Sequence, residues 1–238
     1  MNITILACGS RPWQLWRGYW GLSMLVNDSL LYDSFANYRT LRKRLSDNKV
    51  DPAQIEKIVI SHDHWDHING LWGFLQESRI ENRPVYLPYG TKEETQQRIR
   101  DLGGNPLIVP APQKLSEDVF LSQTLEGDFK GQKVAEHSLV LQTAKGMILL
   151  VGCGHPGILK MVQQAKKAFS SPIYGVIGGF HQMHDSEESI SQCAQALAKE
   201  GVQMVAPTHC SGKRAERIFK GLFSQGYVSL CEGQRLAL

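Results

Sequence analysis

Short runs of apolar, often β-branched residues alternate with segments of helical periodicity along most of this chain. Near the N-terminus, strands are expected at Ile3–Ala7, Leu22–Val26 and Leu30–Tyr32, and their close succession favours antiparallel pairing. Tyr38–Leu45 is expected to be a helix, because two leucines recur there at an i, i+4 spacing with basic residues around them. The alternation is typical of an α/β protein.

The next part of the chain continues the same pattern. Lys57–Ile60 predicts a strand that ends almost directly at a histidine, and further elements are expected as a strand at Val85–Leu87 and a helix at Lys92–Leu102. The prolines of Pro106–Pro112 indicate a turn.

A hairpin is expected next. Gln132–Thr143 and Met147–Val151 flank the short polar segment Ala144-Lys145-Gly146, which predicts that the two runs pair as antiparallel strands.

A topological unit then recurs three times: a strand, a short loop that contains histidine, and a helix. The expected strands are Met147–Val151, Ile173–Ile177 and Val202–Ala206. No linker or low-complexity segment interrupts the chain, so we expect one domain spanning residues 1–238.

Composition excludes several classes of protein. Apolar residues make up 42% and charged residues 21% of the 238 positions, which argues against disorder, and a net charge of +3 requires neither a nucleic-acid nor a membrane partner. The five cysteines form no CxxC pair, and the N-terminus lacks the pattern of a signal peptide. No apolar run is long enough for a membrane span. We therefore expect a cytoplasmic protein.

The residues best suited to bind a metal ion are concentrated in the segment His62-Asp63-His64-Trp65-Asp66-His67. A strand that runs into this segment places two imidazoles two residues apart, where both can face one metal ion, while Asp66 and His67 begin a helix and can face a second ion. The alternative is a polar loop that merely caps a helix. Five ligand-capable residues among six, directly after an apolar strand, favour the metal site.

At this point the sequence resembles the metallo-β-lactamase superfamily, over nearly its whole length. Tyr32-Asp33-Ser34 is similar to the turn whose aspartate supports the metal-binding loop in that family. The resemblance implies an α/β fold, the αββα sandwich, with two mixed sheets flanked by helices. One branch, the 7,8-dihydropterin-6-methyl-(ribofuranosyl)aminobenzene-5′-phosphate synthases, is also similar in five short segments: 20–23, 136–139, 152–158, 178–181 and 207–212.

The resemblance also implies the ligands of two metal ions. His62, His64 and His137 would hold the first metal, and the second would be held by Asp66, His67 and His209.

The chain departs from the family pattern at three places. Cys153 stands where the family has a bridging aspartate. The spacing is compatible with Cys153 as a metal ligand, with Cys153 as an inert buried thiol and with His155 in place of the aspartate, and we favour Cys153 as a ligand of the second metal. Asn69 stands where glycine is common, and Ser34-Phe35 replaces the usual Thr-Gly after the supporting aspartate.

Two metal ions would lower the pKa of a bound water, so that hydroxide is available near neutral pH. The implied protein is a hydrolase, or a phosphoribosyl-type transferase, of a small phosphorylated or pterin-like metabolite. Zinc is the first expectation for both ions, with manganese or iron as alternatives. Asp66, His155 and His181 are the candidate catalytic residues, and the two histidines are candidates for a phosphate contact or a proton donor, or for a purely structural role.

The alternative function is a non-haem iron oxidoreductase on the same scaffold. Partners are expected to be small molecules, and the sequence leaves homo-oligomerisation open. Trp13, Trp16, Tyr19 and Trp20 crowd one loop, where they can stack on a flat ligand, form a subunit contact or pack on the protein's own core.

Overall fold

The computed structural model describes residues 1–238, which form two compact units. Unit 1 comprises Met1–Pro110 together with the C-terminal residues Cys231–Leu238, and unit 2 comprises Ala111–Leu230. Each unit contains a mixed sheet with helices packed on it. The predicted fold class, α/β with two mixed sheets flanked by helices, is confirmed.

The sheet of unit 1 has seven strands in the order β15-β1-β2-β3-β4-β5-β6. The pairs from β15 to β3 are antiparallel, and those from β3 to β6 are parallel. Its strands are β1 (Asn2–Gly9), β2 (Gly21–Val26), β3 (Leu30–Tyr32), β4 (Lys57–Val59), β5 (Arg83–Pro88), β6 (Gly104–Val109) and β15 (Arg235–Ala237).

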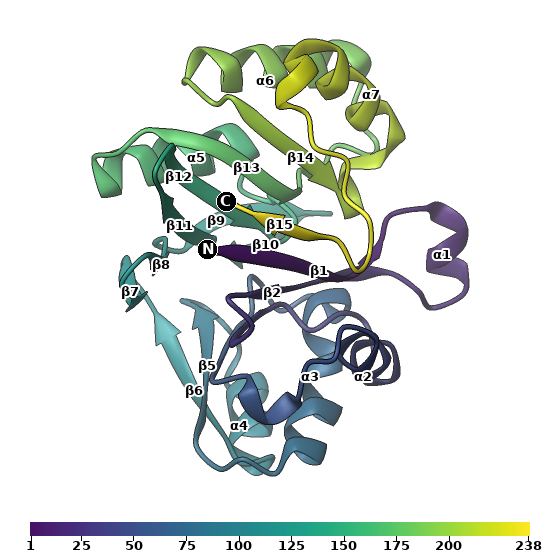
Figure 1. Ribbon diagram of the computed structural model, residues 1–238, viewed down its shortest axis with the longest axis vertical. Helices are drawn as coiled ribbons and strands as arrows, with labels where there is room; N and C mark the ends of the chain where they lie inside the picture. The colour runs from purple at the N-terminus through teal and green to yellow at the C-terminus, as the bar shows by residue number, and fades with distance from the viewer. The chain divides into compact units, whose positions relative to one another are not determined.

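The helices of unit 1 bury leucine and isoleucine stripes against this sheet. In α2, the side chain of Asn37 accepts a hydrogen bond from the Thr40 amide at 2.9 Å and caps the helix start. The C-terminal strand β15, yellow in Figure 1, lies beside the purple β1 and closes one edge of the sheet. The helical elements are α1 (Pro12–Trp16), α2 (Tyr38–Asp47), the 3₁₀ turn η1 (Pro52–Gln54), α3 (Trp65–Ser78) and α4 (Glu93–Asp101).

The larger sheet of unit 2 has six strands in the order β14-β13-β12-β11-β8-β7, and β9 and β10 form a separate hairpin. The parallel pairs in this sheet are β12 with β13 and β13 with β14. The strands are β7 (Gln113–Ser116), β8 (Val119–Leu121), β9 (Leu125–Phe129), β10 (Gln132–Glu136), β11 (Leu139–Thr143), β12 (Gly146–Val151), β13 (Ile173–Gly179) and β14 (Met204–Thr208).

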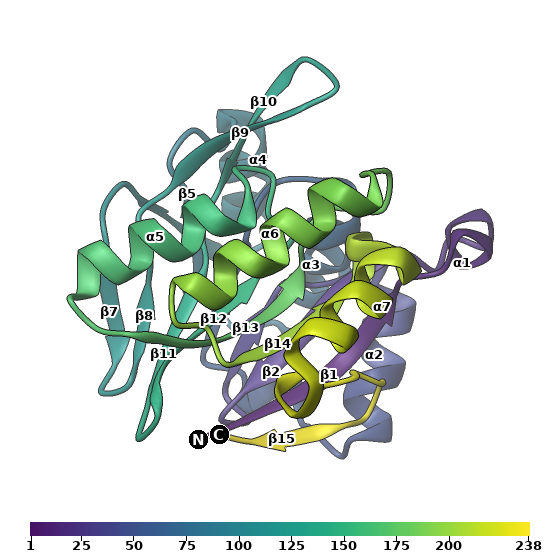
Figure 2. The ribbon, with the colours of Figure 1, turned by 90° about the horizontal axis from the view of Figure 1, so that it is seen from above.

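Three long helices follow these parallel strands and pack on them (Figure 2). In α5 the buried positions Ile158, Met161, Val162 and Ala165 follow the i, i+3, i+4, i+7 spacing of one helical face. The helical elements are α5 (Ile158–Phe169), α6 (Glu187–Lys199), η2 (His209–Ser211), α7 (Gly212–Phe223) and η3 (Ser224–Gly226). No helix in the chain combines the length and the apolar character needed to cross a membrane.

Two expectations from the sequence were wrong in this part of the fold. Pro106 does not start a turn but lies within β6, where its missing N–H is tolerated because β6 is the edge strand of the sheet. Gln132–Thr143 is not one strand: β10 pairs with β9 and β11 pairs with β12, and the break between them falls at His137-Ser138. The hairpin around Lys145 is confirmed for β11 and β12.

Candidate metal centre

In unit 1, the candidate residues meet because consecutive parallel strands end at one edge of the sheet. Asp33 directly follows β3, and His62 comes three residues after the end of its parallel neighbour β4. The carboxyl ends of parallel strands are where α/β proteins assemble their sites. The strand–loop–helix reading of this segment is confirmed, with α3 beginning at Trp65.

The carboxylate of Asp33 connects the residues at this edge of the sheet through hydrogen bonds. It is fully buried and accepts three hydrogen bonds, from the Ser61 amide at 2.7 Å, the Ser61 hydroxyl at 2.8 Å and Nδ1 of His67 at 2.6 Å. Because the Ser61 hydroxyl donates to Asp33, its lone pair faces Nδ1 of His62 at 2.9 Å. Both imidazoles are thus protonated on Nδ1, which leaves Nε2 of each as the basic nitrogen that a metal requires.

The other nitrogens of the motif lie close together. Nε2 of His62 is 3.1 Å from Nδ1 of His64, and Nε2 of His67 is 3.7 Å from the Asp66 carboxylate. Two imidazole nitrogens on one tetrahedral zinc ion are separated by roughly 3.3 Å, so the first pair fits a shared ion. Burial lowers the pKa of His64, which favours the neutral imidazole that binds metal.

The departures Ser34-Phe35 and Asn69 leave the Asp33 turn intact. Phe35 adopts a left-handed φ of 64°, and its amide donates to the Leu22 carbonyl at 3.1 Å. The amide and hydroxyl of Ser34 both donate to the His67 carbonyl, at 2.7 and 2.8 Å. Asn69 lies on the exposed side of α3 and accepts from the indole of Trp72 at 3.2 Å.

Two glycines allow the backbone to close around α3. A Cβ at Gly70 would lie 1.8 Å from the carbonyl oxygen of Ser34, and one at Gly21 would lie 2.0 Å from the carbonyl oxygen of Asp66. The turn and the helix that present Asp33 and Asp66 therefore touch through backbone atoms, with no room for a side chain.

In unit 2, the loops after β12, β13 and β14 begin at one edge of the sheet, as the recurring strand–loop–helix pattern predicted. The ligand atoms of Cys153, His209 and Cys210 lie within 4.8 Å of one another, and all three residues are buried. His209 holds a left-handed φ of 50° directly after β14. Thiolate and imidazole donors at this spacing fit a transition metal such as zinc or iron better than a hard cation.

Glu136 holds the loop that carries Cys153. Its buried carboxylate accepts hydrogen bonds at 2.9 Å from three consecutive backbone amides, those of Cys153, Gly154 and His155. The next residue along the chain, His137, is also fully buried. Glu136 thus connects the segment of one candidate ligand to the loop of another.

His155 and His181 lie side by side. Their ring centroids are 4.4 Å apart, and the ring of Phe129 faces each of them edge-on at 5.5 and 5.4 Å. Both line a hollow of about 240 Å³ at the start of α5. The sequence prediction placed both at strand ends, and the structure brings them together. The exposed position of His184 agrees with a solvated surface residue.

Sequence reasoning missed three residues of these sites: Cys210, Glu136 and Gln182. Cys210 adjoins His209 in the same strand-end loop, and its thiol was therefore a signal that could have been used. A glutamate next to a candidate histidine ligand was a similar signal for Glu136. Nothing in the sequence distinguishes Gln182 from other loop glutamines.

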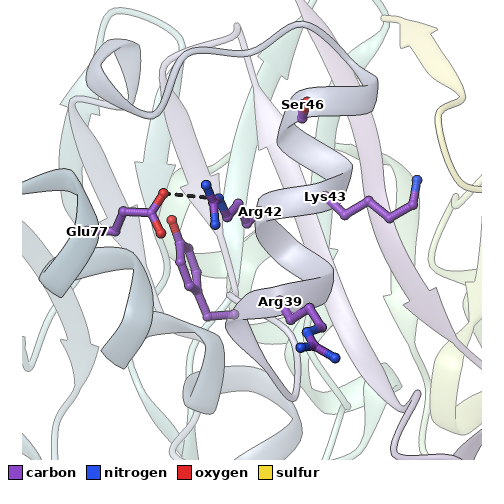
Figure 3. Close-up of a pocket in the computed structure, with 6 residues that line it drawn as sticks. Arg39, Arg42, Lys43, Ser46 and Glu77 are labelled. Carbon is purple, nitrogen blue, oxygen red and sulfur yellow. Dashed lines mark ion pairs between the residues drawn. The ribbon is translucent and has the colours of Figure 1, made fainter.

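A larger hollow, of about 450 Å³, lies along α2 and contains none of the candidate metal or catalytic residues. Arg39, Lys43 and Arg42 extend from the helix, and Arg42 pairs with Glu77 of α3 at 3.1 Å (Figure 3). Burial raises the pKa of Tyr38 in this hollow to about 12. Its charged groups are mostly exposed, as expected of a solvated helix face.

The four aromatic residues of the N-terminal loop divide into two pairs. Trp20 is buried and Tyr19 packs on Phe35 with ring centroids 5.0 Å apart, which agrees with core packing. Trp13 and Trp16, in α1, are 59% and 88% exposed.

The sequence of the chain is similar to known proteins of one family. The family model described as the metallo-beta-lactamase superfamily matches residues 21–140. The 7,8-dihydropterin-6-methyl-4-(beta-D-ribofuranosyl)-aminobenzene-5'-phosphate synthase of Methanocaldococcus jannaschii is 27% identical, over 90% of this chain and 88% of its own length.

Solved structures are similar over the full chain. A metal-dependent hydrolase of the beta-lactamase superfamily, Tm1679, has a TM-score of 0.80 at 23% identity, covering 100% of this chain and 99% of that one. The short form of human tRNase Z has a TM-score of 0.63 at 16% identity, with coverage of 100% and 99%.

Proposed function

The chain belongs to the metallo-β-lactamase superfamily of metal-dependent enzymes, and from that premise we propose a hydrolase, or a phosphoribosyl-type transferase, of a small phosphorylated or pterin-like metabolite. In this proposal His62, His64 and His137 hold one divalent metal. The second is held by Asp66, His67, His209 and Cys153, and zinc is the metal proposed for both.

The Asp33 network carries the proposal. Asp33 and the Ser61 hydroxyl engage Nδ1 of His67 and Nδ1 of His62, so Nε2 of each ring is the nitrogen available to a metal. A buried group of imidazoles oriented in this way by hydrogen bonds on the other ring nitrogen suits a divalent cation. The buried Cys153, His209 and Cys210 donors support the same conclusion for unit 2.

The chain's own residues have separate tasks in this reaction. When bound, the metal pair supplies an activated water and stabilises developing negative charge. Asp33 keeps Nδ1 of His67 protonated and fixes the orientation of the ring. His155 and His181, whose imidazoles can donate a proton to a leaving group, act as the acid or as the phosphate contact.

The proposal of a phosphorylated substrate is supported by the name of the Methanocaldococcus jannaschii relative, whose product is a 5'-phosphate. The alternative, a non-haem iron oxidoreductase, uses the same donors but a different reaction.

One experiment separates these readings. Protein purified without chelator is expected to contain about two transition-metal ions per chain and to cleave bis(p-nitrophenyl) phosphate slowly, since an activated water is not selective for one electrophile. Elemental analysis and a panel of phosphodiesters, esters and lactones, with zinc, manganese or iron, measure both. Metal-loaded protein that cleaves nothing on the panel would contradict the hydrolase, and flavin-dependent oxygen consumption would identify the oxidoreductase.

Cys153 and His155 are expected to respond differently to substitution. Cys153→Ala should remove about one of the two metals, because a thiolate ligand is lost, whereas Cys153→Asp should retain metal and part of the turnover. His155→Ala should lower turnover by about 10²–10⁴-fold with the metal content unchanged, as for the loss of an acid or base.

Cobalt substitution adds a direct readout, because a cobalt–thiolate bond gives a near-ultraviolet charge-transfer band. The band should weaken in Cys153→Ala, which leaves the Cys210 thiol of the same group, and should persist unchanged in Cys231→Ala, whose thiol is exposed. If His155→Ala removes a metal and Cys153→Ala does not, the two roles are reversed.

A further inference from the structure

The hollow at the start of α5 combines a helix N-terminus with two imidazoles and a buried amide. It measures about 240 Å³ and is lined by residues of unit 2, among them His155, Gly157, Leu159, His181 and Gln182, with Asp185 as its one acidic residue. We propose that it binds the phosphate group of the substrate and that Gln182 contacts the neighbouring part of the same molecule. This inference rests on the proposed function, and it assigns the substrate class of that site.

The first turn of α5 offers amides to an anion. The helix has 12 residues, Gly157 at its N-cap provides no side-chain acceptor, and no acidic residue occupies its first turn. The N–H groups at the start of a helix have no acceptor within the helix and carry partial positive charge. The N-terminus of α6 differs, because Ser186 caps it and Glu187 and Glu188 occupy its first turn. A phosphate is suited to the uncapped terminus of α5.

Gln182 provides an independent sign that the hollow takes a ligand. The residue is only 5% exposed, lines the hollow, and its Oε1 atom has no hydrogen-bond partner. A buried amide oxygen left without a partner costs free energy in the empty protein. Its amide group also interacts with the thiol of Cys193, which can either accept or donate. The amide can therefore present its oxygen to a ligand hydroxyl, or its NH₂ to a phosphate oxygen.

Two imidazoles complete the lining. His155 and His181 lie with ring centroids 4.4 Å apart, and His181 holds a left-handed φ of 53° two residues after the end of β13. The ring of Phe129 contacts both imidazoles, with ring centroids 5.5 and 5.4 Å apart. Ring N–H groups are donors to phosphate oxygens in any protonation state, since each imidazole carries at least one.

These groups select a phosphate monoester that carries a nearby hydroxyl, such as a sugar phosphate. The helix amides and the imidazoles bind the phosphate, while Gln182 contacts a hydroxyl of the sugar and so favours a sugar phosphate over free phosphate. Ribose 5-phosphate should therefore bind more tightly than inorganic phosphate, and ribose without phosphate should bind weakly.

The test measures binding of inorganic phosphate and ribose 5-phosphate to the metal-loaded protein by calorimetry. Leu159→Glu adds a carboxylate to the first turn of α5, which favours the helix but competes with a bound anion, and should weaken both ligands at least about tenfold. Gln182→Met removes the amide at similar size and should weaken ribose 5-phosphate by about tenfold and inorganic phosphate less.

Ala168→Glu is the matched control, because it makes the same change of charge at the exposed far end of the same helix. It should bind both ligands within about twofold of the wild type. Circular dichroism and metal analysis establish that each variant is folded and loaded.

Equal affinity in all the proteins would overturn the inference, since the phosphate would then bind elsewhere, for example on the metals. The proposed function would survive that result, because metal content and cleavage of the substrate panel test it separately. The opposite result is also possible. If the wild-type protein contains no metal and has no turnover, but binds phosphate and loses that binding in Leu159→Glu, the proposed function is refuted and the phosphate site is supported.

Discussion

Asp66→Ala and His62→Ala are each expected to remove metal and to lower turnover at least about 100-fold. Loss of residues that merely support a ligand already costs 10–100-fold in metal affinity or activity, and loss of a ligand should cost more. Asp66 is buried at the first turn of α3, and His62 is fully buried beside His64 and His67. Elemental analysis should give about one metal per chain in either variant, and steady-state kinetics measures the rate.

The chain provides matched controls for both substitutions. Asp63→Ala removes a carboxylate from the same loop, but Asp63 is not among the proposed ligands, and His184→Ala removes an exposed imidazole. Both variants should keep the wild-type metal content. If Asp63→Ala loses metal and Asp66→Ala does not, the ligand assignment within the motif is wrong.

Gly70→Ala is expected to destabilise unit 1 by about 3 kcal/mol, the upper end of what forced overpacking costs. The added methyl group would lie 1.8 Å from the Ser34 carbonyl oxygen, so α3 must move away from the Asp33 turn. Because Ser34 also binds the His67 carbonyl, this movement should displace His67 from Asp33 and weaken metal binding. Urea unfolding of the metal-loaded protein, together with metal analysis, measures both effects.

Gly221→Ala is the control for this substitution. Gly221 also lies within a helix, α7, but a Cβ there meets nothing within 4 Å. Alanine is the better helix former, so stability should rise by up to about 1 kcal/mol. Equal stability of Gly70→Ala and the wild type would show that the backbone contact between α3 and the turn is dispensable.

Much of the fold was predictable because its elements leave strong local signals. Largely buried strands such as β12 and β13 appear as continuous apolar runs, and amphipathic helices such as α5 show one apolar face. The less regular region from β7 to β9 was not predicted, since its strands are short and partly exposed and so lack a clear apolar pattern of their own.

By itself, the sequence determined which residues are candidate metal ligands and at which strand ends they lie. A strand followed by His62-Asp63-His64-Trp65-Asp66-His67, and three later strands that end in histidine loops, place these candidates at sheet edges, because parallel strands must point the same way.

Only the tertiary structure decided which distant groups hold those candidate ligands in place. Glu136 binds three amides that lie 17 to 19 residues further along the chain, and Asp33 binds His67 34 residues away. Position 70 must be glycine because the Ser34 carbonyl, from the turn after β3, leaves no room for a side chain there. Local pattern reports the backbone conformation and burial of a segment, but not which distant polar group will satisfy its hydrogen bonds. That choice is made only when the chain packs, because an unpaired buried group is then costly.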